Sequence, residues 1–151
     1  MYSRQEASLI RKKFWTRFGQ YMRPVTGVNG DTINWLNYKT GIRHIYFRMD
    51  ADRDRVVIAI ELRHPDPGLQ RDNFDKLSQL RSLLKQSTGE DWDWYLLTKD
   101  EDGQLTSRIS KELKGVSIFR EEDWPAIISF LKPRIIALDE FWQLVKDGFQ
   151  S

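Results

Sequence analysis

The sequence contains no cysteine, which excludes disulfides, thiol catalysis and thiolate metal sites. It has only two histidines, His44 and His64, and their spacing matches no zinc motif. No Gly-rich phosphate loop and no Gly-x-Ser-x-Gly motif is present. No apolar run approaches the roughly 20 residues of a membrane span, and the first residues lack the apolar core of a signal peptide. We therefore expect a cytoplasmic protein that enters no membrane and holds no metal or cofactor.

The composition is that of a globular protein, with 40% hydrophobic and 30% charged residues among 151. This length predicts a single domain over residues 1–151. The charge is uneven, because residues 1–65 carry 12 Lys and Arg against 6 Asp and Glu, whereas residues 66–151 carry 12 against 16. The basic half predicts a surface for an acidic partner, with solvated charges distributed by chance as the plainer interpretation.

Local signals divide the chain into helices and strands. Ser3 and Glu6 form a capping-box pattern at the start of a first helix, which Pro24 ends. Asp66 and Pro67 favour the start of a second helix, and Gly89 favours its end. The segments predicted after the first helix are, in order, strands at 33–39, 44–50 and 56–63, a helix at 69–87, strands at 92–98, 105–113 and 116–119, and a helix from 121 that Pro133 kinks or splits.

The order is therefore helix, three strands, helix, three strands, helix. Short connections between the strands favour antiparallel pairing, because parallel neighbours need long crossovers. We expect the α+β class, with a mostly antiparallel sheet of about five or six strands and helices packed on it.

Ionic side chains gather on one face of the strands at 44–50 and 56–63. Side chains alternate across a strand, so His44, Tyr46, Arg48 and Asp50 share a face, as do Glu61 and Arg63. If Asp52 and Arg53 form the turn centre, His44 lies opposite Glu61, and Tyr46 lies opposite Ala59.

This ionic face is the predicted binding site. Its residues are His44, Tyr46, Arg48, Glu61 and Arg63. The plainer interpretation is a set of ordinary ion pairs on the more polar side of a half-covered sheet. No residue is assigned a catalytic role.

An acidic residue upstream of Glu61-Leu62-Arg63 also resembles the metal site of PD-(D/E)xK nucleases. In those enzymes an Asp and a Glu hold a divalent cation, and a Lys follows two residues after the Glu. Here Arg63 takes the place of the Lys, and Asp50 is the candidate Asp. A metal-dependent nuclease-like enzyme using Asp50 and Glu61 is therefore the alternative function.

Several stretches together resemble a bacterial domain-of-unknown-function family, from about residue 10 to residue 146. They are "FWTRFGQYM", "INWLNYKTGIRHIYFRMDA", "VVIAIEL" and "EEDWPAIISFLKPRIIALDEFW". Members of this family stand alone or form the C-terminal part of proteins that begin with a restriction-nuclease-like domain. The resemblance implies an accessory role beside nucleic-acid enzymes, and it assigns no catalytic or binding residues.

The function predicted from the sequence is a non-catalytic cytoplasmic binding or interaction module. Its partner is unknown, with nucleic acid as one possibility. A homodimer is another, since the C-terminal helices carry Trp142 and Phe149 near their end.

Overall fold

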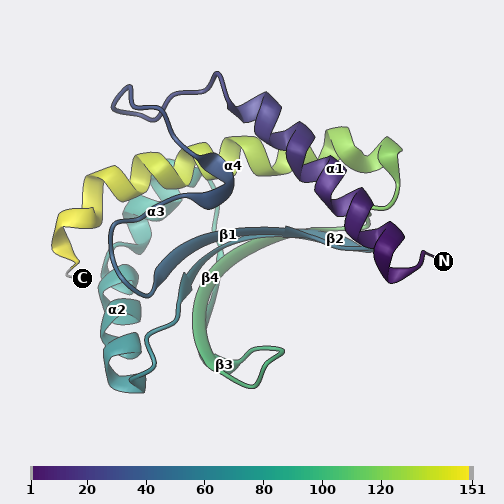
Figure 1. Cartoon of the computed structure of the whole chain (residues 1–151). Helices are drawn as coiled ribbons and strands as arrows, with labels where there is room; N and C mark the ends of the chain where they lie inside the picture. Colours follow the sequence, from purple (N-terminus) through teal and green to yellow (C-terminus); the bar gives the residue numbers. More distant parts are fainter. Residues whose placement is uncertain (1, 150–151) are drawn as a thin grey trace.

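The computed structural model describes residues 2–149 and consists of one antiparallel sheet with helices packed on it (Figure 1). The strand order is β1-β2-β4-β3. The strands are β1 (Ile45–Ala51), β2 (Arg55–Leu62), β3 (Asp93–Lys99) and β4 (Leu105–Lys114). The helices are α1 (Arg4–Met22), α2 (Pro67–Gln79), α3 (Arg81–Thr88) and α4 (Trp124–Val145), with short 3-10 turns η1 (Trp35–Asn37), η2 (Glu121–Asp123) and η3 (Lys146–Gly148). The predicted α+β class is confirmed.

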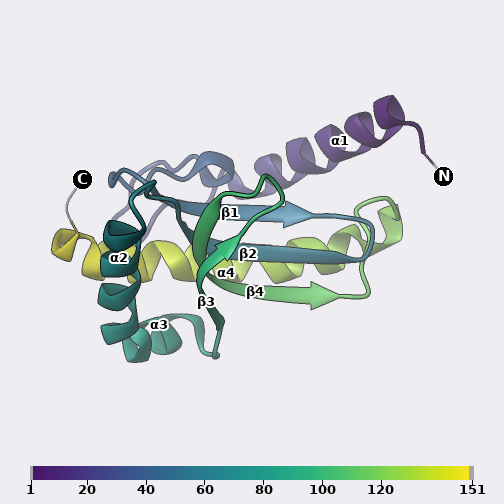
Figure 2. The same cartoon turned by 90° about the horizontal axis from the view of Figure 1, so that it is seen from below.

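One face of the sheet carries the core. On β1 and β2 the alternate side chains Ile45, Phe47, Ile58 and Ile60 are buried, as the period of two requires. Helix α4 lies along this face and α1 crosses beside it, while α2 and α3 cover its curled end (Figures 1 and 2). No helix of residues 2–149 lies on the opposite face, and because β4 and β3 curl, this face is concave (Figure 1).

Helix α1 follows its sequence pattern closely. Ser3 and Glu6 form the predicted capping box, with each side chain bonded to the other's backbone N–H. Phe14, Phe18 and Met22 recur at helical spacing and are almost fully buried. The helix ends at Met22, two residues before Pro24.

Two predicted strands are absent from the described residues, which leaves four strands rather than five or six. The segment 33–39 is a loop that contains η1, and its Trp35 donates from Nε1 to the Val25 carbonyl at 2.9 Å. The segment 116–119 buries Val116, Ser117 and Ile118 in succession, without the alternation of a strand. In both places the backbone is irregular, yet apolar side chains enter the core. The sequence pattern of apolar residues does not distinguish such a segment from a strand.

The predicted second helix is two helices, because the chain bends at Leu80 between α2 and α3. Asp66 caps α2 through the backbone N–H groups of Gly68 and Leu69, with Pro67 at the first position. Helix α4, in contrast, continues through Pro133 and is not split. Pro133 is exposed, so its ring lies on the solvent side of the helix.

The connection 23–44 is fixed to α4 by a buried polar cluster. Asp139 is 1% exposed, and it accepts from the Tyr38 hydroxyl and, at 2.8 Å, from the Val28 backbone N–H. Trp142 donates from Nε1 to the Thr40 carbonyl at 2.8 Å. These bonds hold the irregular segment in place where a strand ladder would otherwise supply backbone partners.

The aromatic side chains expected at a dimer interface lie inside the described chain. Trp142 is 1% exposed and Phe149 is 5% exposed, and their rings are 5.2 Å apart. Because both rings are buried within one chain, their burial does not favour homodimerisation through them. Within residues 2–149, no helix combines the length and the apolar character that crossing a membrane requires.

Candidate functional site

The uncovered sheet face brings together four of the five predicted site residues. Tyr46, Arg48, Glu61 and Arg63 lie on it, as their strand parity predicts. A single cross-strand row runs from Tyr46 through Glu61 and Arg108 to Tyr95, which joins all four strands. We call this surface the open face.

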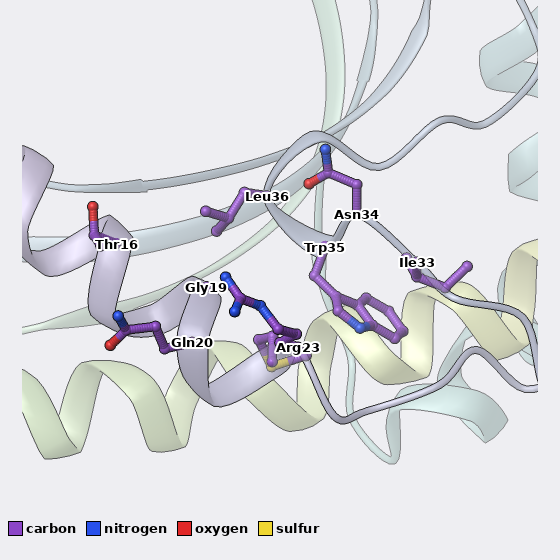
Figure 3. Close-up of a pocket in the computed structure, with 9 residues that line it drawn as sticks. Thr16, Gly19, Gln20, Arg23, Ile33, Asn34, Trp35 and Leu36 are labelled. Carbon is purple, nitrogen blue, oxygen red and sulfur yellow. The ribbon is translucent and has the colours of Figure 1, made fainter.

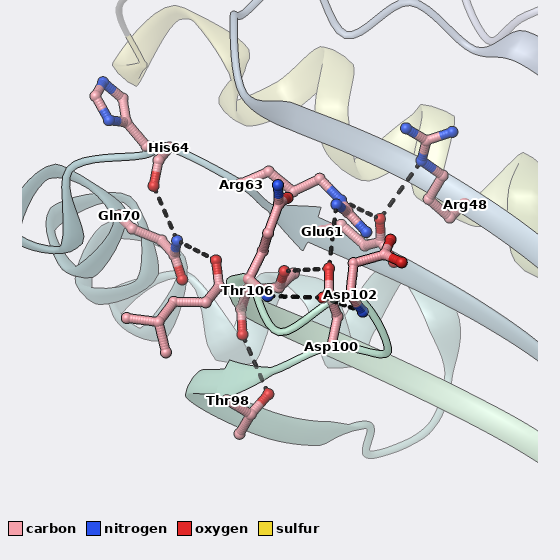
Figure 4. Close-up of polar contacts among 11 residues, drawn as sticks. Arg48, Glu61, Arg63, His64, Gln70, Thr98, Asp100, Asp102 and Thr106 are labelled. Atoms are coloured by element: carbon pink, nitrogen blue, oxygen red, sulfur yellow. Dashed lines mark hydrogen bonds and ion pairs between the residues drawn. The ribbon is translucent and has the colours of Figure 1, made fainter.

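Glu61 is the electrostatic centre of the open face (Figure 4). Its carboxylate accepts from Arg63 Nε at 2.9 Å and lies 3.4 Å from Arg48 Nε. The Glu61 side chain is only 17% exposed, so these contacts are screened less than those of fully exposed pairs. The hydrogen bond to Glu61 raises the pKa of Arg63. Glu61 thus fixes two guanidinium groups side by side.

His44 does not face Glu61, and this prediction is wrong. The observed register pairs Tyr46 with Glu61 and Arg48 with Ala59, because the turn centre lies one residue later than expected. Such a shift moves every pair by two residues and leaves the faces unchanged. His44 lies just before β1 at φ 68°, with its ring 4.5 Å from that of His64. Loss of hydration, then His64 and Arg43, lower the pKa of His44.

Two tyrosine–arginine pairs stand on the open face. Arg48 lies 4.9 Å from the ring centre of Tyr46, and Arg108 lies 4.9 Å from that of Tyr95. Tyr46 is 38% exposed and Tyr95 is 39% exposed, so each ring still presents surface to solvent. Arg108 and Tyr95 were absent from the predicted site, because no local pattern shows that β4 pairs with β2.

The turn between β3 and β4 is tied back to the open face through Asp100. Arg63 Nη1 lies 3.5 Å from an oxygen of Asp100, and the same carboxylate accepts from the backbone N–H groups of Gln104 and Asp102 at 2.9 Å each (Figure 4). This contact joins β2 to the tip of the hairpin, and it supports the curl that makes the face concave.

Acid titration tests the Asp100 contacts. The Gln104 N–H, then the Asp102 N–H and Arg63, hold the pKa of Asp100 below its ordinary value of 3.8. The ionised carboxylate therefore stabilises the hairpin fully above pH 3.8, and this contribution is lost as the pH falls. We expect the NMR amide shifts of Asp102 and Gln104 to titrate with a midpoint below 3.8, and Arg63→Gln to raise it. A midpoint at or above 3.8 in the native chain contradicts these contacts.

Asp50 shares the open face but lies far from Glu61. Asp50 pairs with Val57, whereas Glu61 pairs with Tyr46, four residues away along β1, which is about 13 Å. Burial raises the pKa of Asp50. Residues 2–149 contain no group of three or more His, Asp or Glu side chains that could hold a metal ion.

A separate hollow of about 340 Å³ lies between α1 and the loop that carries η1 (Figure 3). Its lining residues are Thr16, Gly19, Gln20, Met22, Arg23, Ile33, Asn34, Trp35 and Leu36. None of the predicted site residues lies there, and it contains no carboxylate or histidine. The hollow therefore offers neither an acid–base pair nor a metal site.

Comparisons with known proteins show the family of this chain but give no activity. The chain is 25% identical over 96 residues to "Uncharacterized protein MJECL04" of Methanocaldococcus jannaschii, a match that covers 58% of this chain and 22% of that relative. No solved structure matches the chain. The family described as "Domain of unknown function (DUF4268)" matches residues 10–146, as the quoted stretches predicted. Because this match spans most of the sequence, the chain belongs to the DUF4268 family.

Proposed function

We propose that this chain is a non-catalytic cytoplasmic module that binds single-stranded nucleic acid on its open face, as an accessory to a nucleic-acid enzyme. The observation that carries the proposal is the pair of exposed tyrosine–arginine stacks on a sheet face that no helix covers. Unpaired bases stack on aromatic rings and on guanidinium planes, and a concave sheet can present both.

The spacing of the two stacks suits a polymer rather than one small ligand. Tyr46 and Tyr95 lie at opposite ends of one cross-strand row, three strand spacings apart, which is about 14 Å. Glu61 and Arg108 lie between them. An extended strand crossing the sheet along this row can place one base on each tyrosine.

The charges on the open face indicate that stacking dominates over phosphate contacts. Arg48 and Arg63 already contact Glu61, and Arg63 also contacts Asp100. Arg108 is exposed and stacked on Tyr95. We therefore expect one or two phosphate contacts, and because each adds about 0.7 to the logarithmic salt slope, the slope lies between about −0.7 and −1.4.

Fluorescence anisotropy with labelled 12-nucleotide DNA and RNA single strands tests the proposal. The native chain should bind single strands more tightly than the matching duplex, because bases in a duplex are not free to stack on the protein. The salt slope should stay shallow, as calculated above. Equal binding of duplex and single strands, a slope steeper than about −3, or no binding at low salt would contradict the proposal.

The metal-dependent nuclease remains a prediction from the sequence. The engagement of Glu61 by two arginines, and its separation from Asp50 along β1, favour a binding surface over a shared metal ion.

A further inference from the structure

Strand β1 forms one edge of the sheet, and its free side is defined by the ladder to β2. The Arg63 N–H bonds to the His44 carbonyl, and the Asp52 N–H bonds to the Arg55 carbonyl. Because an antiparallel ladder alternates, the even-numbered residues from 44 to 52 point their backbone groups toward β2. The odd-numbered residues of β1 point theirs away from the sheet. We call this side the β1 edge.

Both ends of the β1 edge are hydrogen-bonded, whereas within residues 2–149 the outward backbone groups at its centre have no hydrogen-bond partner. The Ile45 carbonyl accepts from the Thr40 hydroxyl at 2.8 Å, and the Ile45 N–H bonds to the Ile42 carbonyl. At the other end, the Ala51 carbonyl accepts from Arg11 Nη1 at 3.1 Å. Between them, Phe47 and Met49 each present one N–H and one carbonyl outward. Four neighbouring backbone groups form a template for one added strand.

Helix α1 shapes the space beside this template. Figure 2 shows α1 projecting past the β1 edge on the core side of the sheet. A hollow of about 120 Å³ lies beside the edge, and it is lined by Trp15, Leu36 and Met49. Arg11, from the same helix, reaches the Ala51 carbonyl and the Asp52 carboxylate at the end of the edge. The edge therefore combines free backbone groups with an apolar hollow.

We propose that the β1 edge binds an extended polypeptide segment as a fifth antiparallel strand. Four hydrogen bonds join this segment to Phe47 and Met49. Paired residues share a face of a sheet, so the segment residue opposite Met49 points toward the hollow between Trp15 and Leu36. The residue opposite Arg48 points to the open face. We therefore expect the segment to carry apolar residues opposite Phe47 and Met49 and an acidic residue opposite Arg48.

A second copy of this chain fits the β1 edge less well. A two-fold axis that uses all four open groups passes through Arg48, so it places Arg48 directly opposite its own copy, and like charges in that position are destabilising. The same axis puts both projecting α1 helices on one side of the joined sheet. A single extended segment avoids both problems, and its acidic residue complements Arg48.

Selection from a displayed library of random 10-residue peptides tests the proposal. The expected result is enrichment of apolar–acidic–apolar patterns, and a synthetic selected peptide is then titrated against three chains. Met49→Pro removes one outward N–H without touching the β2 ladder, so it should weaken binding at least about 10-fold. Met49→Leu keeps the N–H and should bind within about 2-fold of the native chain. Arg48→Glu should shift selection from acidic to basic central residues.

The Met49 variants distinguish binding at the β1 edge from binding on the open face. Binding of single-stranded nucleic acid should persist in Met49→Pro, so failure of one proposal leaves the other standing. If Met49→Pro does not fold, N-methylation of the peptide at the residues opposite Phe47 and Met49 provides the same test from the other side. Equal peptide binding by Met49→Pro and Met49→Leu overturns the proposal. Concentration-dependent dimerisation that Met49→Pro abolishes also overturns it, in favour of a second copy.

Discussion

Asp139→Ala is expected to lower the free energy of unfolding by about 2–4 kcal/mol, the largest stability effect that we predict. Asp139 is almost fully buried in α4, and it accepts from the Tyr38 hydroxyl and the Val28 N–H. Removing the carboxylate leaves the buried Tyr38 hydroxyl without its acceptor, which costs about 1–3 kcal/mol, and it also removes the bond from the Val28 N–H. Urea denaturation followed by circular dichroism measures the change in midpoint.

Glu140→Ala is the matched control, because it removes the same charge from the next residue of α4, which is exposed. This control should change stability by no more than about 0.5 kcal/mol. Tyr38→Phe removes one donor to Asp139 and leaves those of Val28 and Gln143, so its loss of stability should lie between those of Asp139→Ala and Glu140→Ala. If Asp139→Ala and Glu140→Ala are equally stable, the buried cluster does not hold the 23–44 segment to α4.

The second large effect concerns the open face, where replacing both Tyr46 and Tyr95 by alanine should weaken single-stranded nucleic-acid binding about 100-fold. Each stacked base contributes about 1–3 kcal/mol, and the two rings stand at separate ends of one row. Either single substitution should cause a partial loss, about 10-fold. Anisotropy titration at constant salt gives the three dissociation constants.

Tyr21→Ala is the control for this pair, because Tyr21 is an exposed tyrosine of α1, away from the sheet. It should bind as the native chain does. Both open-face rings are more than one third exposed, so the double variant should keep most of its stability, and its thermal midpoint is the check on folding. Unchanged affinity in a folded double variant would remove the tyrosines from the binding surface, and with them the stacking proposal.

The two proposed surfaces meet on β1. Tyr46 and Arg48 face the open side of the sheet, whereas the outward backbone groups of Phe47 and Met49 lie on its edge. Residues on one strand thus serve both surfaces, because side chains point up and down from a sheet while backbone groups point sideways, and Arg48 is the side chain that belongs to both. A module of this design can hold a polypeptide segment and a nucleic acid together.

The sequence alone determined which residues share a face. Tyr46, Arg48, Glu61 and Arg63 lie together as predicted, because the two-residue period of a strand is a local property of the backbone. The capping box at Ser3 and Glu6 was also predicted from the sequence, since it involves only neighbouring residues. These predictions did not depend on where the rest of the chain lies.

Only the tertiary structure decided which residues face one another. His44 was misplaced because one residue in the β1–β2 turn moves the whole register by two. Arg108 and Tyr95 joined the site because β4 inserts beside β2, a pairing between residues about 47 positions apart at Glu61 and Arg108.

The irregular segment 33–39 shows the same limit. Its alternating Ile33 and Trp35 resemble a strand, yet its backbone is held by contacts such as Trp35 to Val25, and the adjoining Tyr38 is held by Asp139 of α4. Periodicity records which side chains are buried, and it carries no information about which partner buries them. Distant contacts supply that information, and they exist only once the chain has folded.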